Sequence, residues 1–148
     1  MEVMIKKYLL ILVLLSTSVF ANDIIIKSSK YSVNETINNI KSIVKQKGLG
    51  VFAVINHKGN ARSVGLTMRE SKVIVFGNPK LGTQLMQENI LAALDLPLRV
   101  LVYEDVDGSV KIAYRNASWL KGLHGLGSNK TVALIDHGLD KLTDKASK

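Results

Sequence analysis

The chain has 148 residues, no cysteine, a formal net charge of +8 and 5% aromatic residues. The missing cysteines exclude disulfides, thiolate catalysis and thiolate metal ligands. The basic residues are spread along the chain instead of clustering with aromatic ones, so we expect no nucleic-acid partner; the charge indicates either a solvated surface or attraction to an anionic envelope component.

Residues 1–21 have the layout of a secretory signal peptide. Lys6 and Lys7 form a basic start, an apolar run follows, and Val19-Phe20-Ala21 offers small or aliphatic residues where a signal peptidase reads. The alternative is a retained membrane anchor, but the apolar run is shorter than the about 20 residues that a bilayer span needs. We therefore predict an exported protein, periplasmic or secreted, in which residues 22–148 form a single domain without a membrane span. Cleavage removes two lysines and one glutamate, which lowers the net charge from +8 to +7.

The first predicted elements are a strand and a well-signalled helix. Asp23–Ser28 contains three consecutive isoleucines, which favour extended backbone. Ser32 and Glu35 have the spacing of a capping box, in which each side chain accepts a hydrogen bond from the backbone N–H of the other residue. The helix that follows carries one apolar stripe and can end at Gly48; the stripe consists of Val33, Ile37, Ile40 and Val44.

Two more strands are predicted in the middle of the chain. Val51–Asn56 is apolar at successive positions, which indicates a strand covered on both faces. His57–Asn60 has the composition of a turn, and Ala61–Glu70 favours no regular element. Lys72–Phe76 is the next strand.

A second helix and a hairpin follow. Asn78 as N-cap and Pro79 at the first helical position predict a helix that fades near Asn89. Asp107-Gly108 predicts a hairpin between residues 99–104 and 109–114. A two-residue loop there would place Glu104 opposite Lys111 and Tyr103 opposite Ile112.

The last part of the chain is predicted to be helical. Asn116 is suited to cap a short helix that holds Trp119, Leu120 and Leu123, and a final helix spans about residues 129–143. The resulting order is β-α-β-β-α-β-β-α-α. It predicts an α+β fold, a two-layer α/β sandwich with one mixed sheet and helices mainly on one face.

The helix start at Asn78 is the first candidate binding site. The free N–H groups of a helix N-terminus attract anions, and Lys80 and Thr83 would add a charge and a hydroxyl. The Gly-x-x-x-x-Gly-Lys-Ser/Thr pattern of a phosphate-binding loop is absent from the sequence. Structural capping by Asn78 and Pro79 is the alternative explanation.

The other candidates are histidines and one carboxylate. His57 and His124 lie in segments predicted to be exposed, where sites are common, although a surface histidine without a role is the alternative. Their spacing, with His137, matches no compact metal motif, so we predict no metal and no cofactor. Asp95 stands alone in an apolar loop, where it either ties the loop or acts as a general acid or base.

The middle of the chain resembles the domain of unknown function 302 family. The resemblance rests on residues 76–83 (FGNPKLGT), 85–87 (LMQ) and 92–98 (AALDLPL), which lead into residues 100–105 (VLVYED), with weaker support at 52–57 and 123–126. It covers about residues 31–126 and implies a helix-on-curved-sheet domain, possibly dimeric, with no known reaction. Asn56 stands where members carry aspartate before the histidine, which weakens an Asp–His pair at His57.

The sequence contains no nucleophile elbow, metal motif or acid pair with a catalytic arrangement. We therefore expect a non-enzymatic binding or accessory domain for a small ligand or an envelope partner. One alternative is an enzyme that uses His57 and His124 near Asn78 and Lys80, which requires these side chains to converge. Another is a structural homodimer module.

Overall fold

The computed structural model describes residues 24–148, and the predicted signal peptide lies outside these residues. Five antiparallel strands form one open sheet in the order β1-β5-β4-β3-β2. The strands are β1 (Ile25–Ser29), β2 (Gly50–Asn56), β3 (Ser71–Gly77), β4 (Leu98–Glu104) and β5 (Val110–Tyr114). The helices are α1 (Val33–Gln46), α2 (His57–Ser63), α3 (Pro79–Glu88), the 3₁₀ helix η1 (Ile90–Leu94), α4 (Ala117–His124) and α5 (Asn129–Ser147).

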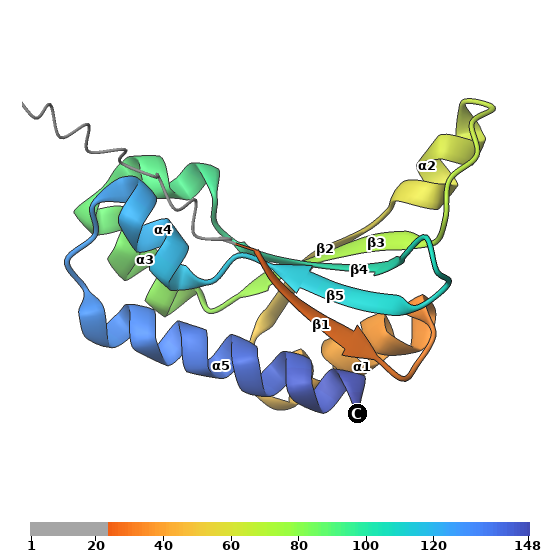
Figure 1. Cartoon of the computed structure of the whole chain (residues 1–148). Coiled ribbons are helices and arrows are strands. Elements are labelled where there is room, and N and C mark those ends of the chain that lie inside the picture. Colours follow the sequence, from red (N-terminus) through yellow and green to blue (C-terminus); the bar gives the residue numbers. More distant parts are fainter. Residues whose placement is uncertain (1–23) are drawn as a thin grey trace, which may run out of the picture.

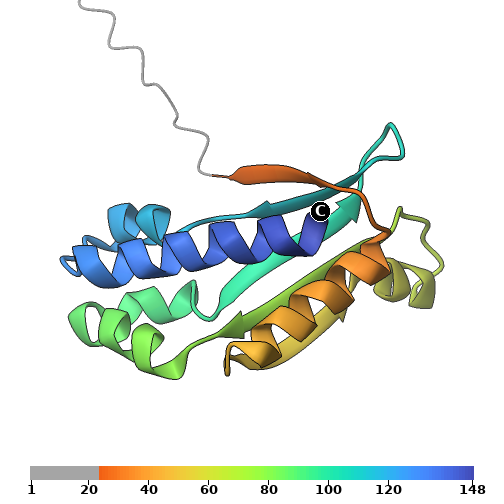
Figure 2. The same ribbon diagram turned by 90° about the horizontal axis from the view of Figure 1, so that it is seen from below.

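The helices are arranged in one layer and at the two ends of the sheet. α1 and α5 cross the same face of the sheet (Figures 1 and 2). α3 and α4 lie beyond one end of the strands, and α2 projects from the other end (Figure 1). The predicted α+β class and two-layer arrangement are confirmed. Within residues 24–148, no helix is long and apolar enough to cross a bilayer.

The sheet differs from the predicted mixed sheet because no two neighbouring strands are parallel. β1 and β2 do run in the same direction across α1, as a β-α-β passage favours. However, they occupy opposite edges of the sheet, with three strands between them.

The core lies between the sheet and the α1–α5 layer. Alternate residues of the three central strands face the helices and are buried: Ile74, Phe76, Val100, Val102, Ile112 and Tyr114. α1 contributes the predicted stripe, and α5 contributes Val132, Ile135, Leu139 and Leu142. The capping box at Ser32 is confirmed, and the hydrogen bonds that Glu35 accepts from the Ser32 side chain and backbone lower the pKa of Glu35.

β2 is an exposed edge strand, so the prediction that both its faces are covered was wrong. Most of its side chains are exposed, including Phe52, which is 56% exposed. The apolar composition of residues 51–55 does not encode where the strand lies in the sheet, and pairing with β3 alone leaves it at the edge. A bulge between Val51 and Ala53 turns the strand locally at Phe52.

The hairpin between β4 and β5 is present, but its predicted register was wrong by one residue. Tyr103 pairs with Lys111 and Glu104 pairs with Val110. The reason is a longer loop, in which Gly108 adopts a φ of +81° and its N–H bonds to the Asp105 carbonyl. A turn that ends on a left-handed glycine adds a residue to the loop and shifts the pairing.

The predicted turn at residues 57–60 is instead the start of α2. Asn56 caps this helix, because its side-chain oxygen accepts a hydrogen bond of 2.9 Å from the Gly59 N–H. The loop after α2 carries the exposed apolar side chains Val64, Leu66 and Met68. α2 itself projects away from the sheet (Figure 1).

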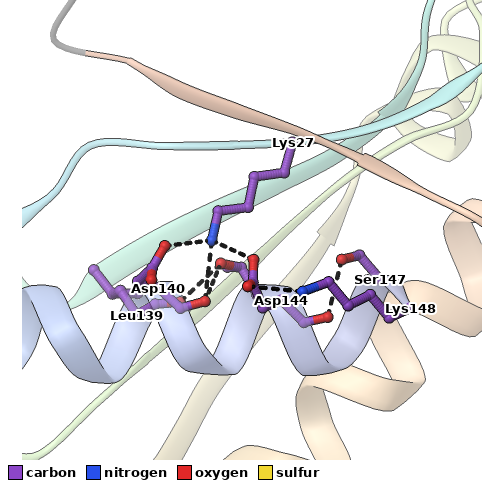
Figure 3. A network of polar contacts seen from close by, with 7 residues as sticks. Lys27, Leu139, Asp140, Asp144, Ser147 and Lys148 are labelled. Carbon is purple, nitrogen blue, oxygen red and sulfur yellow. Dashed lines mark hydrogen bonds and ion pairs between the residues drawn. The ribbon is translucent and has the colours of Figure 1, made fainter.

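A polar network fastens α5 to the β1 edge of the sheet. The Lys27 ammonium, on a side chain only 17% exposed, contacts the carboxylates of Asp140 at 2.6 Å and Asp144 at 2.8 Å (Figure 3). Burial of Lys27 acts against its charge, but the hydrogen bonds to Asp140 and Asp144 outweigh it and raise the Lys27 pKa. The pKa of Asp144 is lowered, chiefly by the hydrogen bond that its carboxylate accepts from Lys27 and next by the one that it accepts from Lys148. The network therefore holds one side of α5, while the other side faces the site described next.

Candidate functional site

An apolar cavity of about 420 Å³ lies between α3, α5 and the adjoining end of the sheet. We call it the α3–α5 cavity. Its walls come from the end of α1 and the middle of α5, which lie on the helix-covered face of the sheet, and from α3, which lies beyond the end of the strands (Figures 1 and 2). Its lining consists of Lys47, Leu49, Phe52, Phe76–Pro79, Leu81–Thr83, Met86, Leu96–Leu98, Leu134, Ile135, Gly138, Leu139 and Leu142.

The turn from β3 into α3 forms one wall of this cavity. The Asn78 side-chain oxygen accepts hydrogen bonds from the N–H groups of Lys80 at 2.9 Å and Leu81 at 3.5 Å, which confirms the predicted cap. Pro79 follows at the first helical position, where it needs no hydrogen-bond donor. The turn lies against the next loop: a Cβ added at Gly77 would stand 3.6 Å from Pro97, which is an ordinary van der Waals contact. The segment that resembles the family thus positions a wall of the cavity.

Two large apolar side chains of the cavity lining are also exposed to solvent. Phe52 on the β2 bulge is 56% exposed, and Leu134 on α5 is 55% exposed. Both also line the cavity. Large side chains that are about half exposed and that also line a hollow are suited to cover part of an apolar ligand.

Two glycines on the facing helices leave space in the cavity. A Cβ atom added at Gly82 of α3 or Gly138 of α5 would have no neighbouring atom within 4 Å. Sterically, neither position requires glycine. A glycine inside a helix costs about 1 kcal/mol relative to alanine, so its presence at Gly138 lowers the stability of α5. The glycine that leaves this space open therefore makes α5 less stable than alanine would.

The charge carried by the described cavity lining is positive. Lys47 is the only charged side chain among the described lining residues. Lys80 follows the lining residue Pro79, and Lys141 lies on the same face of α5 as Leu134 by helical spacing. None of these three lysines forms an ion pair within the part of the chain that the structure describes.

Asp95 and His124 form a pair outside this cavity. The His124 Nε2 atom lies 2.8 Å from Asp95 Oδ2, and the two side chains are 27% and 8% exposed for Asp95 and His124, respectively. The His124 carbonyl also accepts a hydrogen bond of 3.0 Å from the Asn89 side chain. These contacts join the end of α4 to both ends of η1. The pair is therefore placed to tie the loop, which was the structural alternative for Asp95.

His57 lies far from the other candidates. β2 pairs with β3 so that Gly50 faces Gly77 and Asn56 faces Lys72. His57 therefore follows the end of β2 that is about 20 Å from the start of α3, at about 3.3 Å per strand residue. The convergence of His57 with His124 and Lys80 that the enzyme hypothesis requires is not present. Among residues 24–148, no group of three or more His, Asp or Glu side chains is placed to hold a metal.

The structure thus brings only Asn78 and Thr83, of the sequence candidates, to the cavity lining, with Lys80 beside them. Reasoning from sequence missed Lys47, Phe52, Leu134 and Gly138. Two of these, Phe52 and Leu134, are apolar residues of the kind that also form cores. One signal was available: Gly138 stands in the middle of a strongly amphipathic helix, where alanine would favour the helix more.

Comparison with known proteins places the chain in a family. Residues 25–144 match the family model described as domain of unknown function DUF302. The chain is 36% identical over 117 residues to the fluoride-specific ion channel FluC 1 of Brucella suis, covering 79% of this chain and 46% of that protein. It has the same identity over 117 residues to FluC 1 of Brucella abortus, covering 43% of that protein. The chain therefore spans less than half the length of these curated relatives.

A solved structure supports the fold. The crystal structure of an uncharacterized conserved DUF302 protein from Bacillus stearothermophilus superposes with a TM-score of 0.77 at 23% identity, covering 85% of this chain and 99% of that one. At this identity the likeness shows the fold alone. Because the family model covers most of the chain, the protein belongs to the DUF302 family.

Proposed function

We propose that this protein is an exported, non-enzymatic binding domain that holds a small apolar ligand in the α3–α5 cavity. The observation that carries the proposal is the cavity itself, which combines a volume of about 420 Å³ with an almost entirely apolar lining. Ligand pockets in proteins have volumes of about 300–1,000 Å³ and are mostly apolar, with a few polar groups that fix orientation.

The energy available in such a cavity is sufficient for specific binding. Removing about 200 Å² of apolar ligand surface from water is favourable by about 5 kcal/mol, at about 25 cal/mol per Å². Phe52 and Leu134 would lose part of their own exposure at the same time. The cavity is hollow before the ligand arrives, so little reorganisation opposes binding.

The test is the binding of a fluorescent apolar probe, 1-N-phenylnaphthylamine, to the purified protein. We expect saturable fluorescence enhancement that is lost in Gly138→Leu, because the leucine side chain would occupy the cavity. Gly122→Leu is the matched control: Gly122 is also helical and an added Cβ would also meet open space there, but it lies on α4 outside the lining. Absence of binding to the native protein, or equal binding by the two variants, would refute the proposal.

A second candidate function is an accessory domain of a fluoride channel. The observation that favours it is the 36% identity with a segment of proteins named fluoride-specific ion channels. The test is fluoride efflux from vesicles that contain the Brucella suis relative with and without its matching segment. We expect the truncated protein to lose part of its efflux or its regulation, and this chain, added separately, to restore it. Identical efflux from the full-length and truncated proteins would count against an accessory role.

A further inference from the structure

We infer that the ligand of the α3–α5 cavity is a single-chain amphiphile, with its hydrocarbon chain inside the cavity and an anionic head group at Lys47. This inference rests on the proposed function and goes one step further, because it specifies the chemistry of the ligand. Three features of the cavity carry it: the scarcity of polar lining atoms, the length of the walls and the charge at the rim.

The lining excludes a ligand with many polar groups. Its polar side chains, apart from Lys47, are Asn78 and Thr83. The Asn78 oxygen is already engaged in capping α3. A sugar or nucleotide base placed against the remaining walls would lose hydrogen bonds to water without replacing them, which costs free energy for every unpaired group. The part of the ligand inside the cavity must therefore be hydrocarbon.

The walls are long enough for a chain. The lining residues of α3 extend from the Asn78 cap to Met86, and those of α5 extend from Leu134 to Leu142. Eight residues of α-helix rise about 12 Å, so each helical wall follows the cavity over that length. The absence of side chains at Gly82 and Gly138 keeps the space between the walls open. An extended acyl or alkyl chain fits this shape better than a compact ring system.

The charge at the rim selects the head group. Lys47 lines the cavity and is exposed at the end of α1, while no carboxylate belongs to the described lining. Lys80 and Lys141 add positive charge nearby and form no ion pair with any residue from 24 to 148. A cationic head group placed beside Lys47 would meet like charge. An anionic head group would find the counter-charge that the three lysines offer, and the attraction should weaken as salt is added.

The experiment measures the affinity of a homologous series by calorimetry, with every ligand below its critical micelle concentration. The probes are octanoate, decanoate and dodecanoate, together with decanol and decyltrimethylammonium. Each added methylene that enters the cavity should tighten binding about fourfold, the factor that corresponds to burial of one CH₂ group. Decanoate should bind more tightly than decanol, and decyltrimethylammonium should bind most weakly.

The head-group site is tested with Lys47→Gln. We expect decanoate to bind about threefold more weakly to this variant, as the loss of an exposed charge pair predicts, and decanol to bind equally. Lys41→Gln is the matched control, because Lys41 is also an exposed lysine of α1 but does not line the cavity. Circular dichroism of both variants checks that the fold is retained.

The outcomes separate this inference from the proposed function. If phenylnaphthylamine binds and Gly138→Leu abolishes its binding, but affinity does not rise with chain length, the single-chain ligand is wrong and the cavity remains a binding site. If affinity rises with chain length but decanol binds as tightly as decanoate and Lys47→Gln has no effect, the anionic head group is wrong. If neither the dye nor any chain binds, both proposals fail.

Discussion

Replacing Gly138 tests directly whether the hollow beside α5 is real and whether it lowers stability. Gly138→Ala should raise the free energy of unfolding by about 1 kcal/mol, the difference in helix propensity, because an added Cβ meets no atom within 4 Å. For a domain of this size that corresponds to an increase in Tm of about 4 °C. Gly138→Leu should add about 1 kcal/mol more, because part of a leucine side chain becomes buried against the apolar walls.

The assay is urea unfolding followed by circular dichroism, with Gly122→Ala and Gly122→Leu in parallel. At Gly122, which is exposed on α4, alanine should give the same gain from propensity, but leucine should add nothing further. At each position, the stability of the leucine variant minus that of the alanine variant gives the effect of the larger side chain. The amount by which this effect is greater at Gly138 than at Gly122 measures burial of the leucine in the cavity. A Gly138→Leu variant that is less stable than Gly138→Ala would show that the space is too small for a side chain, and the reasoning would be refuted.

Three further predictions concern contacts that hold the site in place. Lys27→Met should lower the free energy of unfolding by about 2 kcal/mol at pH 7. Because the hydrogen bond from Lys27 lowers the pKa of Asp144 in the folded state, that contribution is present above the ordinary carboxylate pKa of about 4 and is lost as the pH falls through the lower folded value. In urea titrations, the difference between this variant and the native protein should therefore shrink as the pH is lowered below about 4. Asp95→Ala and His124→Ala should each lower the free energy of unfolding by about 2 kcal/mol. If the pair ties the loop to α4, a double-mutant cycle should give a coupling energy of about 1 kcal/mol between the two substitutions. Fully additive effects would contradict that role. Asn78→Ala should lower the free energy of unfolding by about 1 kcal/mol, because α3 loses its N-cap. Asn78→Ser should retain most of that stability, because serine also caps helices; a serine variant as unstable as the alanine variant would argue against capping.

The parts of the fold that were predictable are those whose signals are local. The capping box and apolar stripe of α1 lie within one helix, as do Asn78 and Pro79 at the start of α3, and the structure confirms both. The existence of the β4–β5 hairpin followed from Asp107-Gly108. Its register did not, because the left-handed conformation of Gly108 adds a residue to the loop.

The errors concern properties that depend on distant segments. Residues 51–56 have the composition of a buried strand, yet the burial of β2 is decided by its position at the sheet edge, which pairing across the whole chain sets. Asn56 was not recognised as a helix cap because the residues after it also have the composition of a turn.

The candidate site was predictable only in part. Asn78 and Thr83 were expected at a binding site, and both line the cavity, but as flanking polar groups of an apolar pocket. The enzyme alternative required His57 to lie near the start of α3, but His57 lies at the other end of the sheet. An apolar cavity is difficult to predict from sequence, because the residues that line it are of the same types as those of a filled core. The two differ only in whether side chains fill the space between them.

The lining of the α3–α5 cavity comes from four separate stretches of the chain, near residues 47–52, 76–86, 96–98 and 134–142. No single one of these stretches contains the site, so a ligand can bind there only when all four are folded together. Occupancy and global folding are therefore thermodynamically linked: a ligand at about 100 times its Kd would stabilise the whole domain by about 2.7 kcal/mol. Amide hydrogen exchange should consequently slow throughout the sheet and not merely around the pocket, so a cellular ligand could be recognised by its effect on the most protected amides of the protein.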